Sequence, residues 1–150
     1  VPQRFHVNLN GLYKKRINIF SKAAVLADFF GNLGTQRTAV GSNIGILLGS
    51  SKVISFIHNP LEMLNVGFGF YIGSRFEYRF HDFMISGSLF DNEAPFILDS
   101  IPYKYYALVG LAFYGEKWQL QMLFNRASKD NTAQKIKAHN YLTISISRFF

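Results

Sequence analysis

The sequence predicts an all-β protein, a transmembrane antiparallel up-and-down β-barrel of about eight strands. The first reason is composition: 49% of the residues are hydrophobic and 17% aromatic, yet no run approaches the roughly 18 apolar residues of a membrane-spanning helix. The second is the alternation of apolar and polar residues along several segments, because successive side chains of a strand point to opposite faces. The third is the spacing of short turns and long loops between these segments.

The first three strands are expected at residues 5–14, 17–30 and 38–49. In the first, Phe5, Val7 and Leu9 alternate with polar residues. In the other two, small and apolar residues occupy both faces, so their alternation is weaker. We expect the cationic run Lys14-Lys15-Arg16 to form a tight turn between the first strand and the second.

The clearest strand is expected at residues 66–80. Its even positions are aliphatic or aromatic except for one serine, and its odd positions include Arg75, Glu77 and Arg79. The segment exceeds both the roughly 5–6 residues of a soluble strand and the ~9–11 residues that cross a bilayer at a tilt. In a barrel the aromatic face contacts lipid and the charged face lines the lumen. A soluble β-sandwich would instead bury the aromatic face in a protein core.

The last four strands are expected at residues 83–89, 103–114, 118–125 and 141–147. With a periplasmic C-terminus, as in bacterial barrels, the short turns at residues 81–82 and 115–117 fall on the periplasmic side. The long stretches 51–64, 91–102 and 129–138 fall outside, which is the asymmetry expected of outer-membrane barrels. The turn at residues 14–16 also falls outside, against that asymmetry.

Polar residues on the predicted inner face are candidates for a lumen network, with pore selectivity as the functional alternative. Charges inside a barrel should pair across strands, because unpaired buried charge is costly. The members of this predicted network are His6, Lys22, Asp28, Arg75, Glu77 and Arg79. No catalytic motif and no metal-binding pattern occurs, so no catalytic or metal-ligating residue is assigned.

The net charge of +7 suits the phosphates of lipopolysaccharide. Cations at the last long loop are the candidate phosphate contacts, and a simply solvated loop is the alternative. These residues are Lys129, Lys135, Lys137 and His139. Nucleic acid is not expected as a partner, because Lys and Arg are not interleaved with stacking aromatics on a short element.

The C-terminal strand resembles the signal by which the outer-membrane assembly machinery recognises its clients. Its alternating apolar residues and its final aromatic residue are Leu142, Ile144, Ile146 and Phe150. Arg148 stands where an aromatic residue is usual. This ending indicates the outer membrane of a Gram-negative bacterium, with membrane lipid, lipopolysaccharide, the assembly machinery and other outer-membrane subunits as partners.

Three segments carry a resemblance to a known family: FEYRFHDFMISGSLFDNEAPF, GLAFYGEKWQLQMLFNRASKD and KAHNYLTISISRFF. They resemble the lipid A 3'-O-deacylases, the LpxR-like outer-membrane proteins. Upstream, VPQRFHVNLNGLYKKR and GNLGTQRTAVGSNIGILLG resemble the segments that precede this region in the family. The resemblance therefore extends over most of the chain.

The resemblance implies a twelve-stranded barrel roughly twice as long as this chain. It also implies an ester hydrolase whose catalytic histidine, Asn-Asp pair and calcium ligands all lie before the matched region. We therefore expect residues 1–150 to be a single barrel domain carrying the non-catalytic C-terminal strands of such a barrel. The alternatives are a complete eight-stranded barrel with a structural or complex-forming role, and a channel. An eight-stranded interior is only wide enough for side chains, which disfavours the channel.

Overall fold

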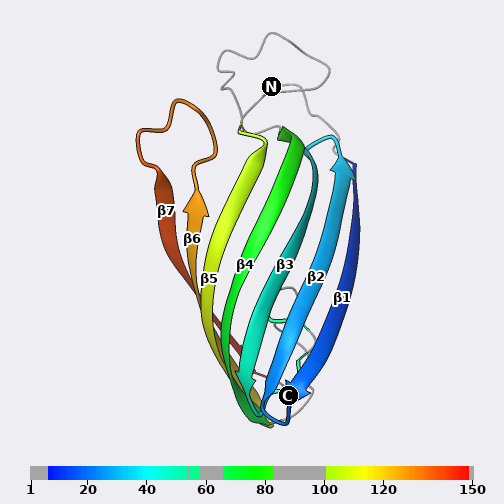
Figure 1. Cartoon of the computed structure of the whole chain (residues 1–150), viewed down its shortest axis with the longest axis vertical. Coiled ribbons are helices and arrows are strands. Elements are labelled where there is room, and N and C mark those ends of the chain that lie inside the picture. Colours follow the sequence, from blue (N-terminus) through cyan, green and yellow to red (C-terminus); the bar gives the residue numbers. More distant parts are fainter. Residues whose placement is uncertain (1–6, 54, 58–65, 83–100, 149–150) are drawn as a thin grey trace.

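The computed structural model describes residues 7–53, 55–57, 66–82 and 101–148, and within them the chain is an antiparallel β-sheet (Figure 1). Seven strands follow one another in sheet order. They are β1 (Asn8–Phe20), β2 (Ala23–Gly34), β3 (Arg37–Gly49), β4 (Gly67–Asp82), β5 (Tyr103–Tyr114), β6 (Trp118–Ser128) and β7 (Ala138–Arg148). This up-and-down order confirms the predicted fold class. In the described part of the chain, no helix is long and apolar enough to cross a membrane.

The sheet is strongly curved, with β1 and β7 at its two edges (Figure 1). Each strand pairs with its neighbour in the sequence, and no pairing joins β1 to β7 within the described residues, so the sheet is not closed. The predicted strand at residues 83–89 lies outside the described residues. β4 pairs directly with β5, Tyr78 lying opposite Tyr103.

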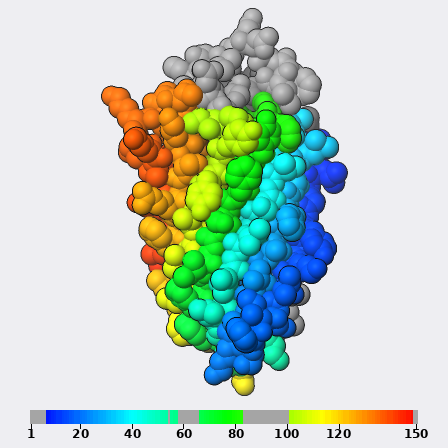
Figure 2. Space-filling view, viewed as in Figure 1, coloured from blue at the N-terminus to red at the C-terminus, as the bar shows by residue number. Residues whose placement is uncertain are grey.

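The outer face of the sheet is apolar. Figure 2 shows this convex surface, on which the side chains of successive strands lie in parallel diagonal bands. Phe68, Phe76 and Ile144 are 39%, 46% and 54% exposed, whereas Arg79 on the opposite face is only 7% exposed. A water-soluble sandwich would show the reverse. So large an exposed apolar surface is suited to lipid and unsuited to water, as the alternation predicts.

The inner face divides along the strand direction into an apolar and a charged part. Tyr71, Leu108 and Ala112 belong to the apolar cluster. Glu77 and Arg79 are buried further along β4. One end of the sheet holds residues 21–22, residues 115–117 and the C-terminal end of β7, and we call it the turn end. We call the opposite end of the sheet the loop end. Along the strands, Tyr71 and Ala112 lie nearer the turn end than Glu77 and Arg79 do.

The predicted turn at Lys14-Lys15-Arg16 is wrong. β1 runs straight through these residues, and the turn is at Ser21-Lys22. Lys14 and Arg16 share the inner face, where Lys14 lies opposite Asp28 of β2 and Arg16 donates a hydrogen bond to the Ser51 carbonyl, while Lys15 is exposed on the other face. The predicted strand at residues 17–30 is accordingly split by the turn.

Two connections lie at the end opposite to the predicted one. Residues 81–82 are the last residues of β4 at the loop end and not a turn, and the connection after β3 leaves from the turn end. Both errors have one cause: counted back from the C-terminus, the predicted strand at residues 83–89 adds one reversal of chain direction, whereas β4 pairs directly with β5. The corrected arrangement places short turns 21–22 and 115–117 together at the turn end.

Candidate functional site

A cluster of charged side chains occupies the loop-end half of the inner face. Glu77, which is fully buried, accepts hydrogen bonds from three arginines. Arg79 donates from Nε over 2.6 Å and Arg75 from Nη2 over 3.0 Å, while Arg37 of β3 reaches Glu77 from the neighbouring strand. Glu77 and Arg79 are two residues apart on β4, so their side chains project from the same face of the strand, toward the lumen.

The cluster continues into the connection between β6 and β7. Asp130 accepts a hydrogen bond of 2.9 Å from Nη1 of Arg79 and another from Lys104 of β5. Arg79 also forms an ion pair of 3.4 Å with Asp82. The loop-end cluster, as we call these residues, comprises Arg37, Arg75, Glu77, Arg79, Asp82, Lys104 and Asp130. It therefore ties β3, β4 and β5 to the last loop.

Two aromatic rings complete the cluster. The guanidinium of Arg75 lies 4.4 Å from the ring centre of Phe30 and 5.3 Å from that of Tyr106. The ammonium of Lys104 is also 5.3 Å from the Tyr106 ring. Cation–π contacts of this kind are worth roughly 0.5–2 kcal/mol, more when water is excluded. These cation–π contacts stabilise Arg75 and Lys104 on the inner face, in addition to the ion pairs that the carboxylates form.

Asp130 is the titratable group of the cluster that lies outside the strands. Burial raises the pKa of its carboxyl, but the hydrogen bond from Lys104 and the charges of Lys104 and Arg79 lower it by more. The net result is a pKa below the ordinary value, so this carboxylate stays ionised and keeps the loop attached to the strands.

A second feature of the inner face is the beginning of the connection between β3 and β4. Residues 51–53 and 55–57, which we call the inner segment, fold back against the concave side of the sheet. Arg16 of β1 donates from Nη1 to the carbonyls of Ser51, over 3.0 Å, and Val53, over 2.8 Å. The hydroxyl of Ser55 donates to Asp28 of β2 over 2.6 Å. Polar groups of the wall thus bind the backbone and side chains of a loop.

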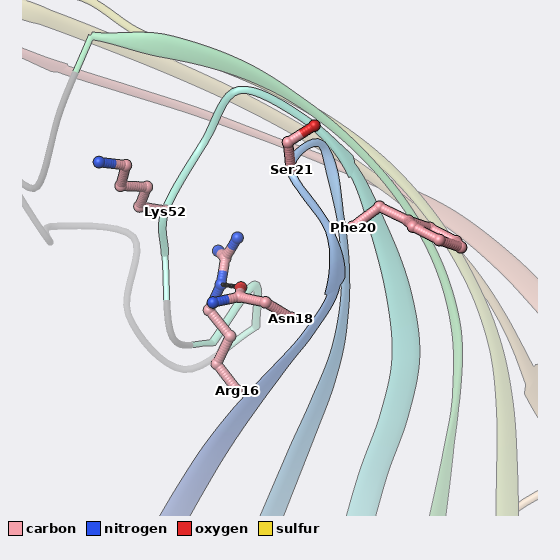
Figure 3. Close-up of a pocket in the computed structure, with 5 residues that line it drawn as sticks. All are labelled: Arg16, Asn18, Phe20, Ser21 and Lys52. Atoms are coloured by element: carbon pink, nitrogen blue, oxygen red, sulfur yellow. Dashed lines mark hydrogen bonds between the residues drawn. The ribbon is translucent and has the colours of Figure 1, made fainter.

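A pocket of about 460 Å³ lies where the inner segment leaves the wall (Figure 3). Arg16 and Asn18 lie on one side, joined by a hydrogen bond of 2.7 Å, and Lys52 lies across from them, while Phe20 points away. Ser21 of the turn completes the lining. The pocket is a gap between β1 and the inner segment, lined by cations and neutral groups.

The structure brings part of the predicted lumen network together. Arg75, Glu77 and Arg79 form the centre of the loop-end cluster, and Asp28 is buried beside the inner segment. Lys22, expected on a strand beside these charges, lies instead in the turn between β1 and β2 at the far end of the sheet. His6 lies outside the described residues.

The predicted phosphate contacts all lie at the loop end, after β6. Lys135 and Lys137 are exposed in the connection, and Lys129 and His139 are half-buried at its two ends. For the predicted assembly signal, Leu142, Ile144 and Ile146 are exposed on the outer face of β7. Phe150 lies outside the described residues.

The sequence reasoning missed several members of the site. Lys104 could have been predicted as an inner-face residue, because it lies four residues before the inward-facing Leu108 on the same strand and therefore projects from the same face. The apolar run Val53-Ile54-Ser55-Phe56-Ile57, in a stretch taken for an exposed loop, is the sign of the inner segment in the sequence. Arg37 joins the cluster because β3 and β4 pair in a particular register, and Asp130 joins it because its loop folds toward the strands. Neither arrangement can be predicted from a local sequence pattern. No three His, Asp or Glu side chains in the described ranges form a group that could hold a metal ion.

Comparison with known proteins gives a consistent result. The family model described as outer membrane protein LpxR matches residues 2–150. Among solved structures, the chain is similar to LpxR from Salmonella typhimurium, with a TM-score of 0.76 and 13% sequence identity, a likeness that shows the fold. The match covers 98% of this chain and 53% of that one, so this chain spans about half the length of its structural neighbour. No curated protein matches the sequence.

Proposed function

Because the chain belongs to the LpxR family of outer membrane proteins, we propose that it forms a rigid, non-catalytic part of the wall of a lipid A deacylase-like barrel. The observation that carries this proposal is the state of the buried carboxylate Glu77. It is fully enclosed and accepts hydrogen bonds from three arginines. A general base must be free to accept a proton from the nucleophile, and this carboxylate is committed to holding strands together.

The open edges of the sheet support the view that further strands complete the barrel. In hydrocarbon, every backbone N–H and C=O of an edge strand needs a partner, and within the described residues β1 and β7 do not pair with each other. With seven antiparallel strands, β1 and β7 run in the same direction. Closing an all-antiparallel barrel therefore needs an odd number of further strands. The twelve-stranded barrel implied by the resemblance meets this condition.

The cations after β6 suit contact with the phosphates of lipopolysaccharide. Lys135 and Lys137 are exposed at the loop end, whereas the long connection after β3 begins at the turn end. With the C-terminus in the periplasm, the loop end faces the outer leaflet, where lipopolysaccharide lies. We propose that Lys129, Lys135, Lys137 and His139 bind its phosphate groups at this surface.

The direct test is mass spectrometry of lipid A after incubation with the protein expressed from its whole gene. The expected result is that lipid A loses one ester-linked acyl chain. Glu77→Gln is expected to lower the amount of product only in proportion to the loss of folded protein. An unchanged acyl pattern with fully folded protein would overturn the enzyme assignment in favour of a structural barrel. A loss of turnover in Glu77→Gln with the amount of folded protein unchanged would overturn the non-catalytic role.

A further inference from the structure

The inner segment occupies a seat that is shaped for it. The ring of Phe56 stacks on that of Tyr71, with centroids 4.8 Å apart and planes at 5°. Gly110 of β5 lies against the Phe56 ring, and a Cβ at this position would overlap it. Gly45 of β3 gives the same room to the Tyr71 ring. The strands therefore carry glycine at the positions that the two rings cover, and both rings fit against the backbone.

The contacts of the inner segment span most of the sheet. They begin at Arg16 of β1 and Asp28 of β2, continue through Tyr71 of β4, and end at β6, where Gln121 donates to the Phe56 carbonyl. A loop resting on one strand would make contacts with that strand and its neighbours alone. This segment crosses the hollow of the sheet from side to side.

Three residues of the inner segment are almost fully buried. Val53, Ser55 and Phe56 are 2%, 0% and 1% exposed, and Val53 and Phe56 belong to the apolar cluster. The Ser55 hydroxyl and the Phe56 carbonyl, the polar groups at the centre, are hydrogen-bonded to the wall. Close packing excludes water at Val53, Ser55 and Phe56, whereas the pocket lined by Arg16 and Lys52 leaves space between β1 and the inner segment.

We propose that the inner segment is a resident plug that closes the lumen at the turn end to water and small solutes. A barrel wider than about eight strands leaves an aqueous interior unless something fills it. The plug fills it with its own apolar side chains, so the charged loop-end cluster is reached by water from the loop end alone. This function is independent of any reaction that the barrel performs.

Site-directed labelling tests the plug in the protein expressed from its whole gene, reconstituted in liposomes. Residues 1–150 contain no cysteine, and any cysteine elsewhere in the expressed protein is replaced by serine, so single cysteines report their own positions. Ser55→Cys is expected to react with a water-soluble maleimide at least about tenfold more slowly than Lys52→Cys, because Ser55 is reached only by local opening. Equal rates at the two positions would overturn the proposal.

Ion conductance across planar bilayers gives a second readout. The unmodified protein and Gly11→Leu, where a Cβ meets nothing within 4 Å, are expected not to conduct. Gly110→Leu displaces the Phe56 ring and is expected to open a steady conductance, provided that its unboiled gel mobility shows a folded barrel. Unmodified protein that conducts as well as folded Gly110→Leu would contradict a plug. The labelling comparison decides the question even if Gly110→Leu does not fold.

Discussion

At the scale of single residues, the inner face is organised by carboxylates that lie between cations. Glu77 contacts Arg37, Arg75 and Arg79, and Asp130 contacts Arg79 and Lys104. Desolvating a charge costs several kcal/mol, and a partner at short range offsets that cost only when its hydrogen bonds are also made. Each member of the loop-end cluster therefore depends on the others.

Glu77→Gln is expected to destabilise the barrel by about 3–5 kcal/mol, because it leaves buried guanidinium groups without their shared counter-charge. The measurement is the free energy of unfolding in urea, in detergent or lipid. Glu116→Gln, an exposed carboxylate in the turn after β5, serves as the control and should change stability by no more than about 0.5 kcal/mol. Equal effects of the two substitutions would show that the cluster contributes no net stability.

At the scale of elements, the sequence predicted strands well and turns poorly. Alternation over residues 66–80 and 103–114 identified β4 and β5, because one face of each is apolar, with Ser74 as the exception on β4. The turn at Ser21-Lys22 was missed because small apolar residues on both sides give no change of pattern there. The inner segment was taken for a solvated loop, since the side that a loop folds toward depends on contacts with distant strands.

The connection between β6 and β7 should detach from the wall in acid. The pKa of Asp130 is lowered in the folded protein, so its contribution to stability is complete above the ordinary Asp value of about 3.9. That contribution is lost as the pH falls through the lowered value. Amide hydrogen exchange at residues 129–137 is therefore expected to accelerate below about pH 4, beyond the intrinsic effect of pH.

Asp130→Asn is the matched control for this pH dependence. Without the carboxylate, the loop should show the faster exchange already at neutral pH and little further change on acidification. Exchange that still responds to acid in Asp130→Asn, with the same midpoint as in the unmodified protein, would assign the effect to another group.

At the scale of the whole molecule, the chain is a curved sheet with a lipid-suited outside and a filled inside. The fold class followed from composition and alternation, because the bilayer demands an apolar outer face of fixed height. The outer-membrane location followed from the resemblance of the C-terminal strand to an assembly signal. How the interior is filled could not be predicted in the same way. The cluster around Glu77 and the seat of Phe56 both arise from register between strands that are far apart in the sequence.

The measurement that tests the central claim most directly is a spin-label scan along β5, with the protein in lipid bilayers. Single nitroxide labels at Tyr105, Val109 and Phe113 are expected to collide readily with oxygen dissolved in lipid. Labels at Tyr106, Leu108 and Ala112 are expected to be shielded from it, giving a period of two. Accessibility to oxygen without that period, or with the two sets of positions exchanged, would contradict an outer face that contacts lipid.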